Sequence, residues 1–256
     1  MIRSLEIREI ARYNGVPEST VERDYAQSWL LKHLQLMPMV FKGGTAIRKA
    51  YIEGYRFSDD LDFTLLVDYE VGPLREAVEA AVDAAVEESG VNFQMGIRVD
   101  ENLNGFVAVV GFRILRNVGA PINIKLDLSK PQNERVLAPV NEADMIHSFS
   151  DNPRNTVRVY ALEEIMAEKM RSVFQRTRPR DLYDVWRLQG LAASEDVVDL
   201  FRNKCDSKNI DPVIGGFVER REDFGNAWET SLQHQIKGLP PFDKAFQEVR
   251  ELLSRL

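Results

Sequence analysis

Apolar positions near the start of the chain change from a helical period to a strand-like run. After the turn at residues 15–17, apolar residues recur every three or four positions up to Pro38, which predicts a helix with one broad apolar face. Ser19 and Glu22 have the spacing of a capping box, so we expect this helix to begin at Ser19. The short apolar run 39–41 ends in two glycines and predicts a buried strand that turns into a helix.

Two later segments, 60–66 and 122–128, alternate strictly between apolar and polar residues. Alternation predicts strands with one face in the core and the other face outside it. The polar positions of the first segment include Asp60 and Asp62, and those of the second include Asp127. Each of the two predicted strands therefore carries carboxylates on the face turned away from its apolar side.

The rest of the first 160 residues mixes helix and strand signals. An amphipathic pattern predicts a helix over 73–88 that ends at Gly90, and apolar runs predict strands near 92–99 and 106–115. We expect the proline-containing stretch 131–158 to be irregular.

Everything after about residue 160 has a helical pattern, so we place a domain boundary there. The expected fold class is α+β: a mixed α/β sheet domain with a helical lead-in over 1–160, then a helical domain over 161–256.

Composition narrows the protein class. Of the 256 residues, 44% are hydrophobic and 29% are charged, which is typical of a globular protein rather than a disordered one. Cys205 is the single cysteine, so no disulfide framework is expected and a reducing cytoplasm is the expected location. No apolar run is long enough for a membrane span, and we expect no membrane partner. The net charge of −7 argues against a broadly basic nucleic-acid coat but leaves room for a local basic patch.

The three strand-borne acids are candidates for a metal site. Side chains two residues apart on a strand point to the same side, roughly 6–7 Å apart, and divalent cations such as Mg²⁺ prefer carboxylate oxygens. If the two strands are neighbours, Asp127 would join Asp60 and Asp62 as a ligand and take the proton from an attacking hydroxyl. Acids on the solvent face of a strand are common, however, and by themselves they favour an ordinary surface.

The glycine turn before the first of these strands suggests a phosphate site. In the run Lys42-Gly43-Gly44-Thr45, glycines let the backbone approach a phosphate, and exposed N–H groups at a helix start favour an anion. The alternative is a plain strand–helix turn in which Thr45 is the N-cap residue. A glycine turn followed by an Asp-x-Asp strand is more specific than either feature alone.

These motifs match a known family. The runs Phe41-Lys42-Gly43-Gly44-Thr45-Ala46 and Arg56-Phe57-Ser58-Asp59-Asp60-Leu61-Asp62-Phe63 closely resemble the AbiEii/AbiGii (MenT-type) nucleotidyltransferase toxins. Residues 21–25 are similar to the family's lead-in helix. Glu168-Lys169 with Arg176 and the run 180–186 are similar to its third and fourth motifs. The resemblance covers about residues 20–190, and the chain beyond carries no matching motif.

The resemblance implies a polymerase-β-like nucleotidyltransferase domain that uses Mg²⁺, or Mn²⁺, and an NTP. It implies metal binding by Asp60 and Asp62, NTP phosphates at the glycine turn, and a role in the site for Asp181. Members of the family are similar to toxins of toxin–antitoxin and abortive-infection systems, and some add nucleotides to the 3′ end of tRNA and block translation. A tRNA acceptor and a cognate antitoxin are therefore the expected partners.

Basic residues gather between residues 169 and 187 of this acidic chain: Lys169, Arg171, Arg176, Arg178, Arg180 and Arg187. Lys169 and Arg176 are seven residues apart and would share a helix face, where a lysine and an arginine suit a triphosphate. Arg178 and Arg180 are then left for RNA. The alternative is a solvated helix face that pairs with nearby acids. A helix that begins at Pro179 would place Asp181 in its first turn, where an acid is favoured by the helix dipole alone.

Ser58 has two interpretations. A serine often caps the turn before a strand, but this serine also precedes the first metal-binding aspartate by two residues. In related toxins the equivalent serine resembles a phosphorylation point that silences the enzyme. Added phosphate charge beside two acids would repel an NTP.

Two other functions remain open. A transferase that nucleotidylates a protein hydroxyl would have the same active site. Residues 7–25 resemble a helix-turn-helix, so a non-catalytic DNA- or partner-binding module is the second alternative, although acids on the second helix make a poor surface for phosphates. The three histidines lack zinc-ligand spacing.

Overall fold

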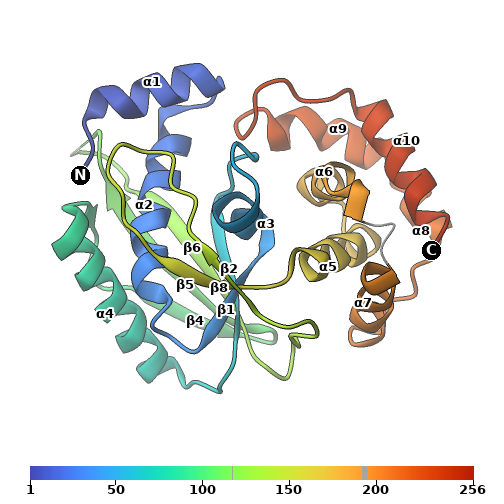
Figure 1. Ribbon diagram of the computed structural model, residues 1–256, viewed down its shortest axis with the longest axis horizontal. Coiled ribbons are helices and arrows are strands. Elements are labelled where there is room, and N and C mark those ends of the chain that lie inside the picture. Colours follow the sequence, from blue (N-terminus) through green and yellow to red (C-terminus); the bar gives the residue numbers. More distant parts are fainter. Residues whose placement is uncertain (117, 192–194) are drawn as a thin grey trace. The chain divides into compact units, whose positions relative to one another are not determined.

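The computed structural model describes residues 1–116, 118–191 and 195–256. Contacts divide the chain into two compact units, Met1–Tyr160 and Ala161–Leu256, and each is considered by itself. The first unit is built on a sheet and the second on helices (Figure 1). Among the described residues, no helix combines the length and the hydropathy that crossing a bilayer requires.

The sheet of the first unit is mixed and, within the described residues, has eight strands. Their order is β3-β5-β6-β2-β1-β8-β7, and β4 pairs with β5 outside this path. The strands are β1 Met39–Lys42, β2 Asp60–Leu65, β3 Asn92–Phe93, β4 Arg98–Asn102, β5 Gly105–Arg113, β6 Ile122–Ser129, β7 Asn141–Asp144 and β8 Thr156–Val159. β2 runs antiparallel to β1 and parallel to β6, and this central trio positions the candidate site.

Both alternating segments form the expected strands. On β2, Leu61, Phe63 and Leu65 are fully buried, while Asp60 and Asp62 are half-buried. On β6, Leu126 is fully buried and Asp127 is half-buried. The apolar face therefore belongs to the core, where burial of each large side chain stabilises the fold by roughly 1.5–3 kcal/mol.

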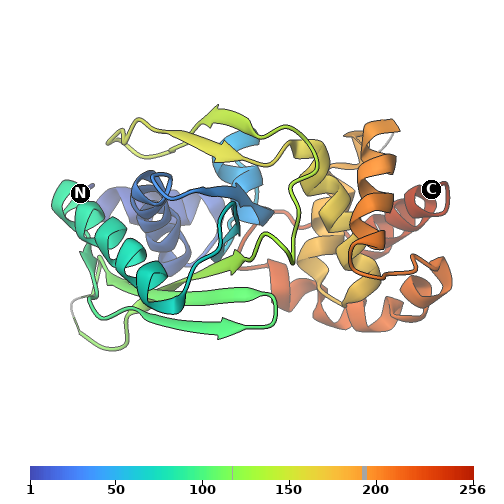
Figure 2. The same cartoon turned by 90° about the horizontal axis from the view of Figure 1, so that it is seen from below.

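The helices of the first unit are α1 Ser4–Asn14, α2 Glu18–Leu34, α3 Gly43–Ala46 and α4 Val71–Ser89, and α3 continues as a π-helical turn over Ile47–Tyr51. Helix α4 ends, as expected, at Gly90 in the left-handed conformation. It packs on β3 and β4, and Figure 2 shows it (teal) beside the green strands. Helix α2 packs against α4, β6 and α1.

Two expectations about α2 are wrong. The helix begins at Glu18 without a side-chain cap, because Glu22 accepts a hydrogen bond from the Leu115 backbone N–H (2.8 Å) instead of completing a capping box. The helix is also buried around most of its circumference rather than along one stripe, and the buried side chains include Asp24 and Gln27. Contacts with other elements thus took the place of the expected capping box and covered more of α2 than the one expected face.

The stretch expected to be irregular contains β7 and β8. β8 pairs in parallel with β1 and antiparallel with β7, so it lies inside the sheet, and the Tyr160 N–H donates to the Phe41 carbonyl (2.9 Å). A four-residue strand gives too little alternation to be recognised among prolines. The predicted strand over 92–99 is likewise two short strands, β3 and β4.

The second unit is helical, as expected. Its elements are α5 Leu162–Gln175, α6 Pro179–Arg187, a 3₁₀ turn at Gln189–Leu191, α7 Glu195–Asp206, α8 Ile214–Glu219, α9 Arg221–Leu232 and α10 Phe242–Leu253. Aromatic rings fill its core, and Phe217 stacks on Phe246 with a centroid distance of 4.7 Å. Pro179 starts α6, because a helix start does not need the N–H that proline lacks.

Candidate active site

Strand register brings the three predicted metal ligands onto one face. β2 and β6 are adjacent and parallel, with Asp62 level with Asp127 and Asp60 level with Lys125. Partnered residues on parallel strands point to the same side of the sheet, so the three acids and the lysine form one block, which we call the acid face. The neighbouring positions on β5 are Val107, level with Asp127, and Val109, level with Lys125.

The glycine turn lies directly against the acid face. Gly43 has φ +77°, and a Cβ placed on it would lie 2.3 Å from Oδ2 of Asp62. A side chain at Gly43 is therefore excluded both by backbone conformation and by Asp62. A Cβ on Gly44 would lie 2.7 Å from Nη2 of Arg56 and 3.2 Å from Oγ of Ser58. The turn is closed on one side by Asp62 and on the other by Arg56 and Ser58.

Side chains hold the four consecutive backbone carbonyls of residues 57–60 that lead into β2. Arg56 Nη1 donates to the first (3.1 Å), and Gln27 Nε2 donates to the second and third (3.1 and 3.0 Å). The fully buried Thr45 hydroxyl donates to the fourth. Thr45 is therefore not the N-cap, a position that Lys42 occupies without a side-chain hydrogen bond. Gln27, which the sequence did not single out, orients the segment that carries Ser58.

Lys42 is more enclosed than a surface phosphate contact would be. It is level with Asp62 across β1 and β2, yet only 8% exposed. Its Nζ lies 3.9 Å from Oε2 of the buried Glu134 and 5.5 Å from the centre of the Tyr160 ring. The lysine thus compensates a buried carboxylate at the end of β1.

A buried ion network anchors the helical turn that follows the glycines. Asp24 of α2 accepts from Arg48 Nε (2.7 Å) and lies 3.0 Å from Lys49 Nζ. Burial alone would raise the pKa of Asp24, but the charges of Arg48 and Lys49 outweigh it and lower the pKa to about 2. Burial lowers the pKa of Lys49 to about 8. The sequence placed Asp24 in a lead-in motif without a role, and the structure gives it this one.

The second unit has its own charged cluster. Lys169 Nζ lies 2.9 Å from Oδ1 of Asp181 and 2.8 Å from Oδ2 of Asp184, and Arg176 Nε donates to Oδ2 of Asp181 (2.8 Å). Burial alone would raise the pKa of Asp181, but Lys169 and Arg176 outweigh burial and hold that pKa well below its ordinary value. Asp184 is fully buried and contacts Lys169 as directly as Asp181 does. We call these four residues the lysine cluster.

Two details of the predicted basic segment differ from expectation. Arg176 has extended backbone at the C-cap of α5, so it does not share a helix face with Lys169; the two side chains instead converge on Asp181. Arg171 is buried, whereas Arg178 and Arg187 are exposed and Arg180 is half-buried. The segment therefore divides into buried and solvated positions rather than forming one cationic stripe.

The acid face has the donor chemistry that a hard divalent cation needs: three half-exposed carboxylates beside a turn that only glycine can occupy. Across residues 1–116, 118–191 and 195–256, however, no three His, Cys, Asp or Glu side chains are gathered closely enough to hold a metal. One carboxylate is engaged elsewhere, because Oδ2 of Asp127 lies 2.7 Å from Nζ of Lys125. The three acids therefore suit a divalent cation by their residue type and by the face that they share, although they are not gathered around one point in this structure.

Comparison with known proteins identifies the family. A family model described as nucleotidyl transferase AbiEii toxin, type IV toxin–antitoxin system, matches residues 29–251. This chain belongs to the AbiEii family. It is therefore a nucleotidyltransferase, with an NTP as substrate and an antitoxin as partner. A comparison with curated protein sequences gave no match.

Solved structures agree with the AbiEii assignment at the level of the fold. MenT4, a nucleotidyltransferase toxin from Mycobacterium tuberculosis, has a TM-score of 0.64 and 18% identity, over 100% of this chain and 91% of that chain. JHP933 from Helicobacter pylori has a TM-score of 0.60 and 18% identity, over 94% of this chain and 92% of that chain. The expected mixed α/β nucleotidyltransferase fold is thus confirmed.

The helix-turn-helix alternative fits the AbiEii structure poorly. The second helix of that motif is part of α2, whose buried residues run from Thr20 to Leu34. A recognition helix must present one side to the major groove, and α2 is instead packed against α1, α4 and β6. Its burial leaves little surface for DNA.

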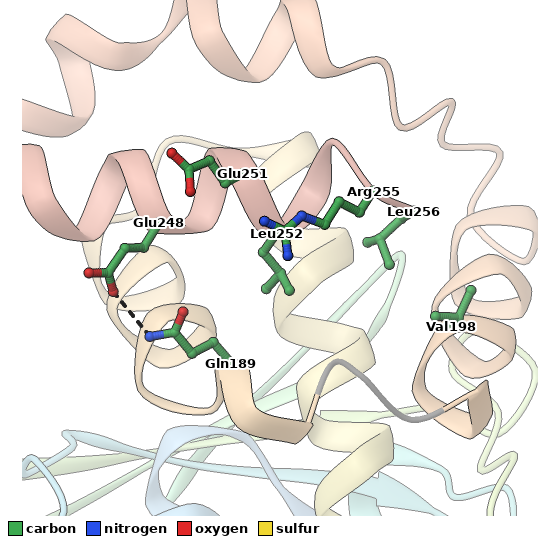
Figure 3. A pocket seen from close by; sticks show the side chains of 7 residues that line it. All are labelled: Gln189, Val198, Glu248, Glu251, Leu252, Arg255 and Leu256. Atoms are coloured by element: carbon green, nitrogen blue, oxygen red, sulfur yellow. Dashed lines mark hydrogen bonds between the residues drawn. The ribbon is translucent and has the colours of Figure 1, made fainter.

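A pocket of about 430 Å³ lies in the second unit (Figure 3). It opens between α7, α10 and Gln189. Glu248 at its edge accepts hydrogen bonds from Trp186 Nε1 (2.7 Å) and Gln189 Nε2 (3.1 Å). Leu252, Leu256 and Val198 supply its apolar lining. None of the candidate active-site residues lines this pocket.

Proposed function

We propose that this AbiEii enzyme transfers a nucleoside monophosphate from an NTP to a hydroxyl of RNA, with the 3′ end of tRNA as the expected acceptor. The acceptor oxygen forms a bond to the α-phosphorus, the bond to the β-phosphate oxygen breaks, and pyrophosphate leaves. An extended 3′ end would no longer accept an amino acid, so translation would stop. The observation that supports this proposal best is the acid face beside the glycine turn.

The proposed roles follow from the chemistry of each side chain. Asp60, Asp62 and Asp127 would hold Mg²⁺ or Mn²⁺, and a bound cation would supply charge neutralisation for the phosphates. An oxygen of Asp127 would accept the proton of the attacking hydroxyl. We propose that the backbone N–H groups of Gly43 and Gly44 bind phosphate oxygens.

In the second unit we propose Lys169 and Arg176 as triphosphate contacts. Asp181 and Asp184 hold the Lys169 ammonium on two sides, which fixes its position before a ligand arrives. Loss of a contact made in both the ground state and the transition state raises KM and lowers turnover. Lys169→Ala should show both effects.

The test of the proposal is incubation of the purified protein with each radiolabelled NTP, total tRNA and Mg²⁺. Label should appear in tRNA with the wild type and be absent with Asp62→Asn, which preserves side-chain size while removing the charge. Label in a protein band would support protein nucleotidylation instead. Transfer by Asp62→Asn at the wild-type rate would contradict the role of the acid face.

We further propose that Ser58 is a regulatory phosphorylation site. Its hydroxyl lies against Gly44, and its segment enters the strand of Asp60 and Asp62. A phosphate there would add close to two negative charges beside the acids and occupy the place of an NTP phosphate. Ser58→Ala should retain transfer and Ser58→Glu should lose most of it, as measured by label incorporation. Equal rates would remove Ser58 from the site.

A further inference from the structure

We infer that Lys125 regulates cation binding at the acid face, because it holds Asp127 in an ion pair that a divalent cation must displace. This inference rests on the proposed metal-dependent function and adds to it a residue that neither the motifs nor the family description assigns. It makes Lys125 a positioning residue whose effect is exerted through Asp127.

The geometry comes from strand register. Lys125 precedes Asp127 by two residues on β6, so both side chains point to the same face, and Lys125 is the direct partner of Asp60 on β2. Its Nζ lies 2.7 Å from Oδ2 of Asp127. One ammonium thus stands within a block of three carboxylates, level with one of them and bonded to another.

The pair is placed where it can open. The Lys125 side chain is 43% exposed and that of Asp127 is 35% exposed, so water screens the attraction and either partner can be rehydrated. A lysine is a hydrated point charge on a flexible stem, and it can leave a carboxylate without disturbing the backbone. Lys169 of the second unit is only 12% exposed and is held by two buried carboxylates, so it has less of this freedom.

Charge counting shows what the lysine does to a cation. The three acids and Lys125 together carry −2, which a single divalent cation would neutralise. The charge of Lys42, level with Asp62, is compensated by Glu134. Without Lys125 the same block carries −3 and attracts a cation more strongly. The ammonium and a metal also compete for the same Asp127 oxygen. Lys125 therefore weakens binding of a free cation and keeps Asp127 in an ion pair until a cation displaces the lysine.

The experiment measures Mn²⁺ binding in the absence of nucleotide, by isothermal titration and by the electron paramagnetic resonance signal of free Mn²⁺. Lys125→Met removes the ammonium and keeps the length of the side chain. It should bind Mn²⁺ at least about fivefold more tightly than the wild type. Lys125→Arg keeps a cation on Asp127 and should bind no more tightly than the wild type.

A matched control separates this effect from a general change in charge. Lys130 follows β6, and its Nζ pairs with Glu101 rather than with an acid of the block. Lys130→Met removes the same charge and should change Mn²⁺ affinity by less than about twofold. Equal tightening by Lys125→Met and Lys130→Met would overturn the inference, and so would unchanged affinity in Lys125→Met.

Failure of the inference is distinguishable from failure of the proposed function. If Asp62→Asn abolishes Mn²⁺ binding and nucleotide transfer while Lys125→Met binds like the wild type, only the inference fails. If Asp62→Asn binds Mn²⁺ and transfers label normally, the metal site itself is wrong and both fail. Thermal melts of all variants check folding, which should be intact because Lys125 and Lys130 are not in the core.

Discussion

The aspartates of the acid face and those of the lysine cluster have the same side chain but different surroundings. Asp60, Asp62 and Asp127 are half-exposed on a sheet. Asp181 and Asp184 are buried, and each is bonded to Lys169. A half-exposed acid can exchange its partner for a cation at little cost. A buried acid cannot, because its charge needs the partner that it already has.

The two sets of acids are therefore suited to different roles. The acid face is suited to receiving a ligand, and its sequence motif, Asp-x-Asp, reflects spacing along a strand. The lysine cluster is suited to holding one ammonium in place, and its motif reflects the packing of α5 on α6. Replacing an aspartate should therefore lower activity in the acid face and lower stability in the lysine cluster.

The largest expected effect is on catalysis. Asp60→Ala removes a proposed cation ligand and should lower the rate of nucleotide transfer by about a thousandfold or more, which corresponds to about 4 kcal/mol in the barrier. Because Asp60 faces away from the core, the free energy of unfolding should stay within about 0.5 kcal/mol of the wild type. Label transfer and urea denaturation measure the two quantities. If Asp60→Ala lost stability and kept the wild-type rate of transfer, Asp60 would be a structural acid and not a ligand.

The second prediction concerns Asp181. Asp181→Ala leaves Lys169 with Asp184 as its remaining carboxylate and should cost roughly 2–3 kcal/mol in the free energy of unfolding. Urea denaturation monitored by circular dichroism tests it. The matched control is Asp199→Ala, since Asp199 is an exposed acid of α7 whose pair with Arg202 spans 3.9 Å. If both variants unfold at the same urea concentration, the lysine cluster does not stabilise the unit.

The third prediction extends the comparison to a buried acid of the sheet unit. The folded pKa of Asp24 is lowered to about 2, below the ordinary value near 4, so the unfolded chain binds more protons between these pH values. Stability from Asp24 is therefore present above about pH 4 and lost as the pH falls toward 2, by about 2 kcal/mol in total.

Denaturant unfolding of the wild type at pH 5 and pH 2.5, beside Asp24→Asn, isolates this contribution. The asparagine variant starts less stable but should lose less stability between the two pH values, because its side chain does not titrate. Parallel losses in the two proteins would show that other carboxylates cause the acid sensitivity.

The smallest effect is expected at the solvated end of the basic segment. Arg178 is exposed and Arg180 is half-buried, and we propose that they contact RNA phosphates. Reversing both charges should weaken tRNA binding more than NTP binding. Each lost phosphate contact should flatten the plot of log affinity against log salt by roughly 0.7–0.9. Gel shifts at several salt concentrations, with NTP titrations on the same variant, decide it. A loss confined to NTP would assign these arginines to the triphosphate.

Local sequence patterns were sufficient to predict part of this structure. Alternation placed Leu61 and Phe63 in the core and the acids outside it, because successive strand side chains must point to opposite faces. Gly90 ended α4 and Pro179 began α6, since both residues act through their own backbone. The motifs around Gly43 and Asp62 indicated the nucleotidyltransferase family, which the family match confirmed.

Longer-range pairing set the rest. Local pattern could place Lys125 on the face of Asp127, but strand order and register had to bring both beside Asp60 and Asp62. Gln27 and Thr45, on two helices, donate to carbonyls around the start of β2, and Asp184 contacts Lys169 from a neighbouring helix. Residue spacing alone specified which side chains of β2 and β6 face the core, and the motifs specified the family. The packing of distant elements settled which charged groups share a partner, because an ion pair depends on distances that residue spacing does not contain.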